Sequence, residues 1–114
     1  MSAYFDPARI AELQDVLGAD TEAILGSMLT SMTAAIERLE AGVAAGDLDA
    51  AIQAAHRARN DALMLSAARL QVALSELELA ARDADEPRTR EALERVRAVW
   101  APTRAQLAGA ARPN

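Results

Sequence analysis

The most constraining feature of this sequence is one apolar stripe that recurs every three or four residues. Its members are Leu25, Met28, Leu29, Met32, Ile36, Leu39 and Val43. This spacing puts all of them on one side of an α-helix, whereas a half-buried strand would alternate at every second residue. With a start signal at Asp20-Thr21-Glu22 and a stop at Ala44-Ala45-Gly46, the stripe predicts one helix, roughly 37 Å long. Such a helix must bury its apolar face against other elements.

Four further segments show helical spacing between start and stop signals. A short helix is expected over 7–17, with Asp6 as its cap and Gly18 at its end. Two more helices are expected from the cap Asp47 to about residue 65 and over about 67–82, and a last one carries the apolar residues between 93 and 107. The predicted fold class is all-α, an antiparallel up-down-up-down four-helix bundle with a short additional N-terminal helix.

The composition supports helices and excludes several functions. Apolar residues make up 52% of the 114 residues but aromatics only 3%, which suits close helix packing better than sheet faces. One domain over residues 1–114 is expected, with 1–3 and 110–114 frayed. A net charge of −5 argues against nucleic-acid binding. The sequence shows no signal-peptide pattern and no apolar run of the roughly 20 residues that a membrane span needs, so a cytoplasmic location is expected.

The only histidine, His56, lies on the helix predicted to begin after Asp47. At 100° per residue, the inward side of this helix consists of Leu48, Ala51, Ala55, Ala58, Ala62 and Leu65. His56 falls on the opposite, polar side, which also holds Gln53, Asn60 and Met64. Ile52, Arg59 and Leu63 lie at the edge of this side. For the two apolar residues, the helical angle alone does not decide between a place in the core and a place on the surface. His56 is therefore predicted to be exposed.

A lone histidine is compatible with several chemistries. A metal site is disfavoured because Gln53, not a carboxylate, stands three residues before His56 and no second histidine exists. Because no glycine-rich phosphate loop is present, ATP binding by that route is not expected. Phosphate acceptance fits better, since a neutral imidazole is a nucleophile and Arg59, one turn on, can fork onto phosphoryl oxygens. Periodicity alone still favours an incidental surface histidine.

The residues around His56 resemble the signature of histidine phosphotransfer (HPt) domains. That signature is Ala-His-x-Leu-Lys-Gly-x-Ala, followed by Leu-Gly-Ala-x-x-Leu. The chain has Ala55-His56-Arg57-Ala58-Arg59-Asn60-Asp61-Ala62, and then Leu65-Ser66-Ala67 with Leu70. With similar segments at 5–20, 44–47 and 74–78, the resemblance covers roughly residues 4–108. The dimerisation domain of sensor kinases fits less well, because its histidine is usually followed by an acidic residue and a proline.

The resemblance implies a phosphorelay protein, not an enzyme, that shuttles a phosphoryl group between aspartates of response-regulator receiver domains. His56 would be phosphorylated and Arg59 would neutralise the phosphoryl charge. The partners would be receiver domains or a hybrid sensor histidine kinase. The chain itself would be a monomer in the cytoplasm. The chain would need no cofactor or metal, because Mg²⁺ belongs to the receiver. Around His56, the residues expected to contact a partner are Ile52, Gln53, Arg57, Leu63 and Met64.

Three departures from the signature bear on this interpretation. Arg59 replaces the lysine, which keeps the charge but changes a point charge into a planar fork. Asn60 replaces the glycine beside the histidine, where its side chain either assists the phosphoryl group or obstructs a partner. Ser66 replaces a later glycine, with little consequence for the fold. The alternative function is a non-catalytic helical adaptor that docks receiver or kinase domains without carrying phosphate.

Overall fold

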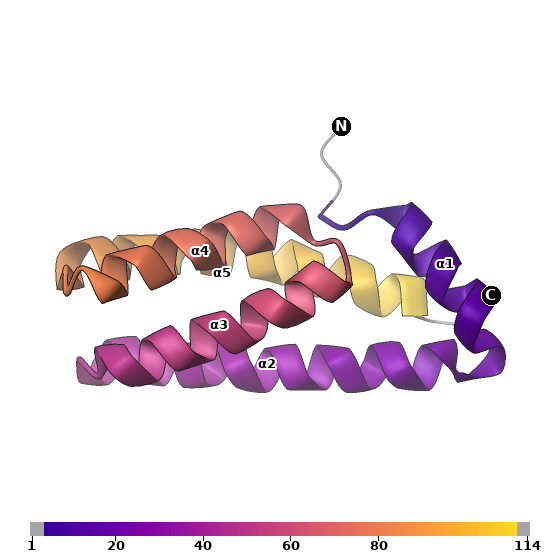
Figure 1. Ribbon diagram of the computed structural model, residues 1–114, viewed down its shortest axis with the longest axis horizontal. Coiled ribbons are helices and arrows are strands. Elements are labelled where there is room, and N and C mark those ends of the chain that lie inside the picture. The colour runs from indigo at the N-terminus through magenta and orange to yellow at the C-terminus, as the bar shows by residue number, and fades with distance from the viewer. Residues whose placement is uncertain (1–3, 112–114) are drawn as a thin grey trace.

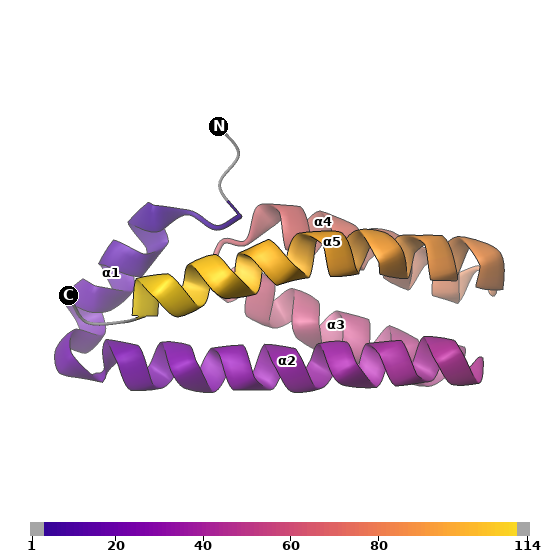
Figure 2. The same ribbon diagram turned by 180° about the vertical axis from the view of Figure 1, so that it is seen from behind.

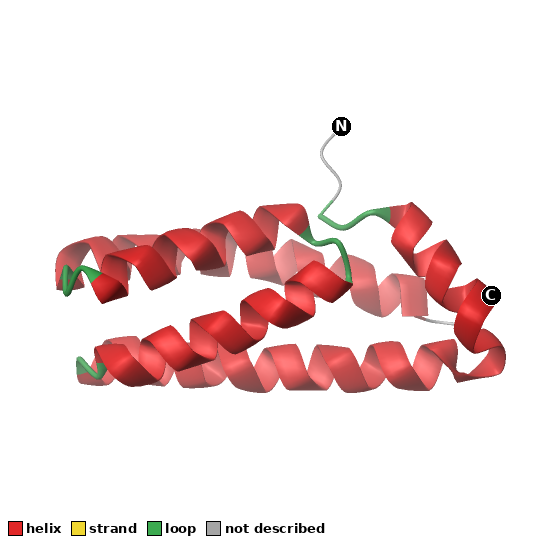
Figure 3. Ribbon diagram, viewed as in Figure 1, coloured by secondary structure: helices red, strands yellow, loops and turns green. Residues whose placement is uncertain are grey.

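The computed structural model describes residues 4–111, which form helices joined by short turns (Figure 1, Figure 3). The elements are α1 (Pro7–Leu17), the 3-10 turn η1 (Gly18–Asp20), α2 (Thr21–Ala45), α3 (Leu48–Met64), α4 (Ala68–Arg82) and α5 (Glu86–Ala111). The predicted all-α fold class is confirmed. Helix α5 includes Ala110 and Ala111, two of the residues expected to be frayed. The other residues with this expectation, 1–3 and 112–114, lie outside the described residues.

The predicted helix caps take their expected form. Asp6 stands before α1 and its carboxylate accepts a hydrogen bond from the backbone N–H of Ala8, at 3.0 Å. Asp47 does the same for α3, accepting from the N–H of Ala50 at 3.1 Å. Each cap satisfies one of the backbone donors that a helix leaves free at its start. The short sequence signals therefore fix where α1 and α3 begin.

Each of the four long helices packs against two others. Helix α2 lies against α3 and α5, and α4 lies against the same two helices (Figure 1, Figure 2). Successive long helices run in opposite directions, so the bundle has the predicted up-down-up-down order. Helix α1 crosses the end of the bundle where α2 begins, and its buried Ile10 joins the core. None of the helices between residues 4 and 111 is both long and apolar enough to cross a membrane.

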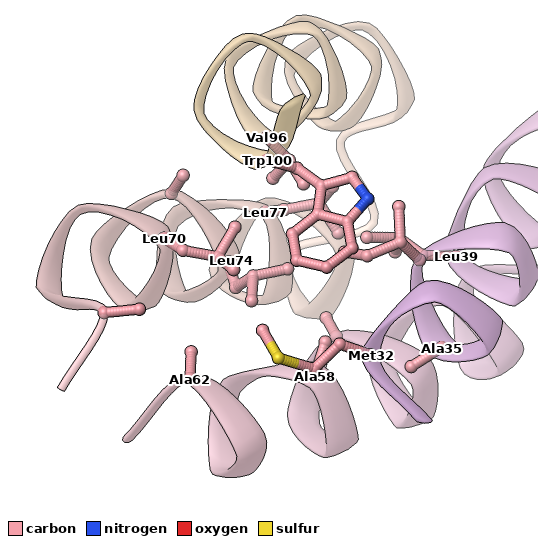
Figure 4. Packing of buried hydrophobic residues seen from close by; sticks show 14 of the residues in the cluster. Met32, Ala35, Leu39, Ala58, Ala62, Leu70, Leu74, Leu77, Val96 and Trp100 are labelled. Atoms are coloured by element: carbon pink, nitrogen blue, oxygen red, sulfur yellow. The ribbon is translucent and has the colours of Figure 1, made fainter. Parts of the chain in front are cut away.

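The core is built from large side chains on three helices and from alanines on the fourth. Met32 and Leu39 of α2, Leu74 of α4 and Trp100 of α5 meet in the centre (Figure 4). Helix α3 contributes the small, buried side chains Ala51, Ala54, Ala55, Ala58 and Ala62. Because the separation of packed helices depends on the side chains between them, α3 lies close to its neighbours.

Gly42 makes the close contact between α2 and α3 possible. A Cβ atom at this position would lie 3.0 Å from the backbone nitrogen of Ala51, closer than two such atoms normally approach. Neither backbone can move without shifting a helix, so a side chain at residue 42 would separate α2 from α3. The small residues on both helices thus hold α3, and with it His56, at a fixed position in the bundle.

Candidate functional site

His56 lies in the middle of α3, on the side away from the alanine face. Its side chain is 54% exposed, as the helical angle predicts. The ring is turned toward α4, where its Nδ1 atom lies 3.8 Å from a carboxylate oxygen of Glu78. The histidine is thus accessible to another molecule while one of its two nitrogens faces protein groups.

Arg59 contacts His56 directly. Its Nη2 atom lies 3.0 Å from His56 Nδ1, within hydrogen-bond distance, and 3.6 Å from Glu78 Oε1. Its Nη1 atom donates a longer hydrogen bond, 3.5 Å, to the hydroxyl of Ser75 on α4. The arginine side chain is one-third exposed. The structure therefore brings the two residues singled out by the sequence into one cluster, with Arg59 held between α3 and α4.

Glu78 is the site residue that sequence reasoning missed. Its side chain is only 8% exposed, and its Oε2 atom accepts two hydrogen bonds from Arg82, at 3.0 and 2.9 Å. Its Oε1 atom is buried and accepts no hydrogen bond from the residues that the structure describes. The available signal was its position four residues after Leu74, which puts a carboxylate at the edge of the inward face of α4. A buried acceptor without a donor is uncommon in proteins.

The remaining predicted site residues surround this cluster at different depths. Leu63 and Met64 are 62% and 55% exposed, so Leu63 belongs to the surface and not to the core. Ile52 is half-buried, so it belongs neither fully to the core nor fully to the surface. The others are exposed, namely Gln53, Arg57 and Asn60. Within the described chain Asn60 forms no side-chain hydrogen bond with His56, so the assisting role is not supported by this arrangement.

Two further features complete the surroundings of His56. Gln53 and Arg57 line a groove between α2 and α3 whose floor is made of small residues, and Arg38 flanks it from α2. On α4, Leu79 follows Glu78 and is 56% exposed, an apolar surface residue that the sequence analysis did not single out. Residues 4–111 hold no group of three or more histidine, cysteine or acidic side chains suited to binding a metal ion.

Comparison with known proteins identifies the family. Residues 23–110 match the sequence model described as the Hpt domain. The fold is similar to the crystal structure of histidine-containing phosphotransfer protein B (HptB) from Pseudomonas aeruginosa PAO1, with a TM-score of 0.88 over 97% of this chain and 96% of that chain. The two sequences are 22% identical, so this likeness concerns the fold. No curated protein matches the sequence significantly.

The chain belongs to the Hpt domain family, whose model matches well over half of its length. It is a histidine phosphotransfer protein of phosphorelays, as the resemblance in the sequence predicted. Members of this family are phosphotransfer carriers and not classical enzymes, and they interact with response regulators and kinases. The match begins at Ala23, so α1 lies outside the matched range.

Proposed function

We propose that His56 accepts the phosphoryl group from an aspartate of one receiver domain and passes it to another. The observation that carries this proposal is the cluster around the only histidine of the chain. His56 is exposed, a cationic arginine lies 3.0 Å from its ring, and a buried carboxylate lies 3.8 Å away. A phosphoryl-accepting imidazole needs access, orientation and charge neutralisation, and these three groups supply them.

The two ring nitrogens have different roles in this proposal. Nδ1 faces Arg59 and Glu78, whereas Nε2 forms no hydrogen bond within residues 4–111 and is the natural nucleophile. In the transfer step the neutral ring carries its proton on Nδ1, so that the Nε2 lone pair attacks phosphorus, the N–P bond forms, and the P–O bond to the receiver aspartate breaks. The aspartate leaves as a carboxylate, and the positive charge left on the ring is stabilised by the nearby Glu78 carboxylate. Arg59 binds the phosphoryl oxygens.

The partners in this proposal are response-regulator receiver domains, or a hybrid sensor kinase that carries one. The docking surface consists of Ile52, Gln53, Arg57, Leu63 and Met64 around His56. Exposed apolar side chains beside a polar rim are what a protein partner needs. The chain would act as a monomer without a cofactor of its own, with Mg²⁺ bound by the receiver.

The test is transfer of labelled phosphate from phosphorylated receivers, beginning with those encoded in the same genome. The label should move onto the chain in an acid-labile form, and His56→Gln should abolish this without changing the helical circular dichroism. Arg104→Gln, at an exposed arginine of α5 outside the proposed docking surface, is the control. If His56→Gln still accepts the label, the site assignment is wrong. Receiver binding without any transfer in the natural chain would instead support the adaptor function.

A further inference from the structure

The hydrogen bond between Arg59 and His56 constrains the protonation of the ring. A guanidinium group has five N–H donors and no acceptor, so across the 3.0 Å contact Arg59 donates and Nδ1 accepts. Nδ1 therefore carries no proton in this arrangement, and the neutral imidazole carries its single proton on Nε2. The Nδ1 lone pair then accepts the hydrogen bond from Arg59, and Nε2, which carries the proton, has no lone pair in the ring plane. Neither nitrogen of His56 is free to attack phosphorus.

The neighbouring carboxylate shows how the ring becomes reactive. Glu78 Oε1 is buried, accepts no hydrogen bond within the described residues, and lies 3.8 Å from Nδ1. Arg82 holds the other oxygen through two hydrogen bonds and so fixes the direction in which Oε1 points. When Arg59 leaves, the proton moves through solvent from Nε2 to Nδ1, where the negative charge of the Glu78 carboxylate, 3.8 Å away, stabilises the N–H group. This restores the Nε2 lone pair.

We infer that Arg59 is a positioning residue with two alternating partners, the Nδ1 atom of His56 at rest and the phosphoryl group during transfer. This inference rests on the proposed function of His56. A phosphorylated partner brings an anion that competes for Arg59, because a guanidinium binds phosphoryl oxygens in a bidentate, charge-assisted way. Loss of Arg59 from Nδ1 and gain of the Nε2 nucleophile then occur together. The ring is reactive only while a phosphoryl group is present.

The first test reads the tautomer of His56 by ¹⁵N nuclear magnetic resonance, at a pH where the ring is neutral. The chain has one histidine, so the assignment is unambiguous. The natural chain should carry the proton on Nε2, whereas Arg59→Met, which keeps much of the side-chain stem, should move it to Nδ1. The double variant Arg59→Met with Glu78→Gln should lose much of that shift. An Arg59→Met spectrum with the proton still on Nε2 would overturn the inference.

The second test compares two electrophiles. Diethyl pyrocarbonate is uncharged and reports only whether a ring lone pair is available, and the sequence contains no lysine that would compete for it. In Arg59→Met its reaction with His56 should be faster by about tenfold, the factor for losing one hydrogen bond to a charged group. Phosphoryl transfer from a receiver should be slower, because the same variant lacks the charge that neutralises the phosphoryl group.

Opposite changes in the two rates distinguish this role from a structural one. A purely structural Arg59 would change both rates in the same direction, and that result would refute the inference. Arg57→Met, at the exposed neighbouring arginine, is the matched control and should leave both the tautomer and the diethyl pyrocarbonate rate unchanged. Transfer to His56 in the natural chain tests the proposed function separately. If that transfer is absent while the tautomer still shifts, the proposed function fails and the Arg59–Nδ1 contact stands.

Discussion

At the scale of single residues, Asn60 is the departure from the family signature whose effect on transfer the sequence leaves open. It is exposed, four residues after His56 on the same face of α3, and forms no side-chain hydrogen bond with His56 within residues 4–111. Removing it therefore costs no hydrogen bond to His56. It does remove a side chain from the surface that a receiver must approach, which favours obstruction over assistance.

We accordingly expect Asn60→Gly to increase the rate of transfer from a phosphorylated receiver, by about threefold, equivalent to roughly 0.6 kcal/mol in the barrier. Glycine inside a helix should lower the free energy of unfolding by about 0.4 kcal/mol relative to asparagine. Rapid-quench kinetics and urea unfolding measure the two effects. Asn60→Ala is the control, because it also shortens the side chain but places a residue with high helix propensity at this position. Slower transfer in both variants would show that Asn60 assists the reaction.

In the proposed transfer step Glu78 also acts as a single residue, through the negative charge of its carboxylate. Replacing it by glutamine keeps the size of the side chain but removes the anion opposite the imidazole. We expect Glu78→Gln to slow transfer by about tenfold, corresponding to about 1.4 kcal/mol of lost stabilisation of the ring charge. Its effect on folding should be small, because Arg59 and Arg82 are both partly exposed and can be rehydrated.

The control for this prediction is Glu76→Gln. Glu76 lies on the same helix, but its carboxylate is about half exposed and pairs with Arg95 of α5. Exposed ion pairs contribute little, so this variant should transfer phosphate at the natural rate. Equal rates for Glu78→Gln and the natural chain would remove Glu78 from the mechanism.

At the scale of elements, the three turns between the long helices share one backbone design. In each, a residue with positive φ follows the helix, and two N–H groups donate back to carbonyls of the last turn. The positive-φ residues are Gly46 at φ 70°, Ser66 at φ 53° and Ala84 at φ 55°. Only one of these three positions holds the residue that adopts this conformation without a steric cost.

This design predicts opposite effects of two reciprocal substitutions. Ala84→Gly relieves a left-handed conformation that costs about 1–2 kcal/mol, partly offset by the larger entropy of the unfolded glycine chain. We expect a net gain of about 0.5 kcal/mol in the free energy of unfolding. Gly46→Ala introduces the same strain and should lose about 1 kcal/mol. Urea unfolding measures both, and a loss of stability in Ala84→Gly would contradict the argument.

At the scale of the whole molecule, one core joins the four long helices, so the bundle should unfold as a unit. Trp100, the only tryptophan, is buried in this core and reports on it by fluorescence. We expect Leu74→Ala, at a fully buried side chain of α4, to lower the free energy of unfolding by about 3 kcal/mol. Fluorescence and circular dichroism should give the same transition.

Leu79→Ala provides the comparison, because it makes the same substitution on the same helix at a side chain that is 56% exposed. It should change stability by no more than about 0.5 kcal/mol. Two separate transitions in either variant would show that the helices unfold in parts rather than as one cooperative domain.

The sequence by itself determined the helices and the exposure of His56. Both depend on local rules, namely the 3.6-residue period, the caps Asp6 and Asp47, and the small or apolar residues on the buried faces. It also placed Arg59 beside His56, because residues three apart on a helix are neighbours. For Ile52 and Leu63, at the edge of the polar face, the angle alone was insufficient, since exposure there depends on how α4 packs against α3.

Only the tertiary structure decided how the ring is held. Glu78 stands 22 residues after His56 in the sequence and reaches it because the alanine face of α3 and the turn at Ser66 bring α4 close. No local pattern predicts which carboxylate of α4 meets the imidazole, because that depends on the relative rotation and height of two packed helices. The same packing brings Arg59 within reach of both Nδ1 and Glu78, so the geometry proposed to control the nucleophile is set by the fold as a whole.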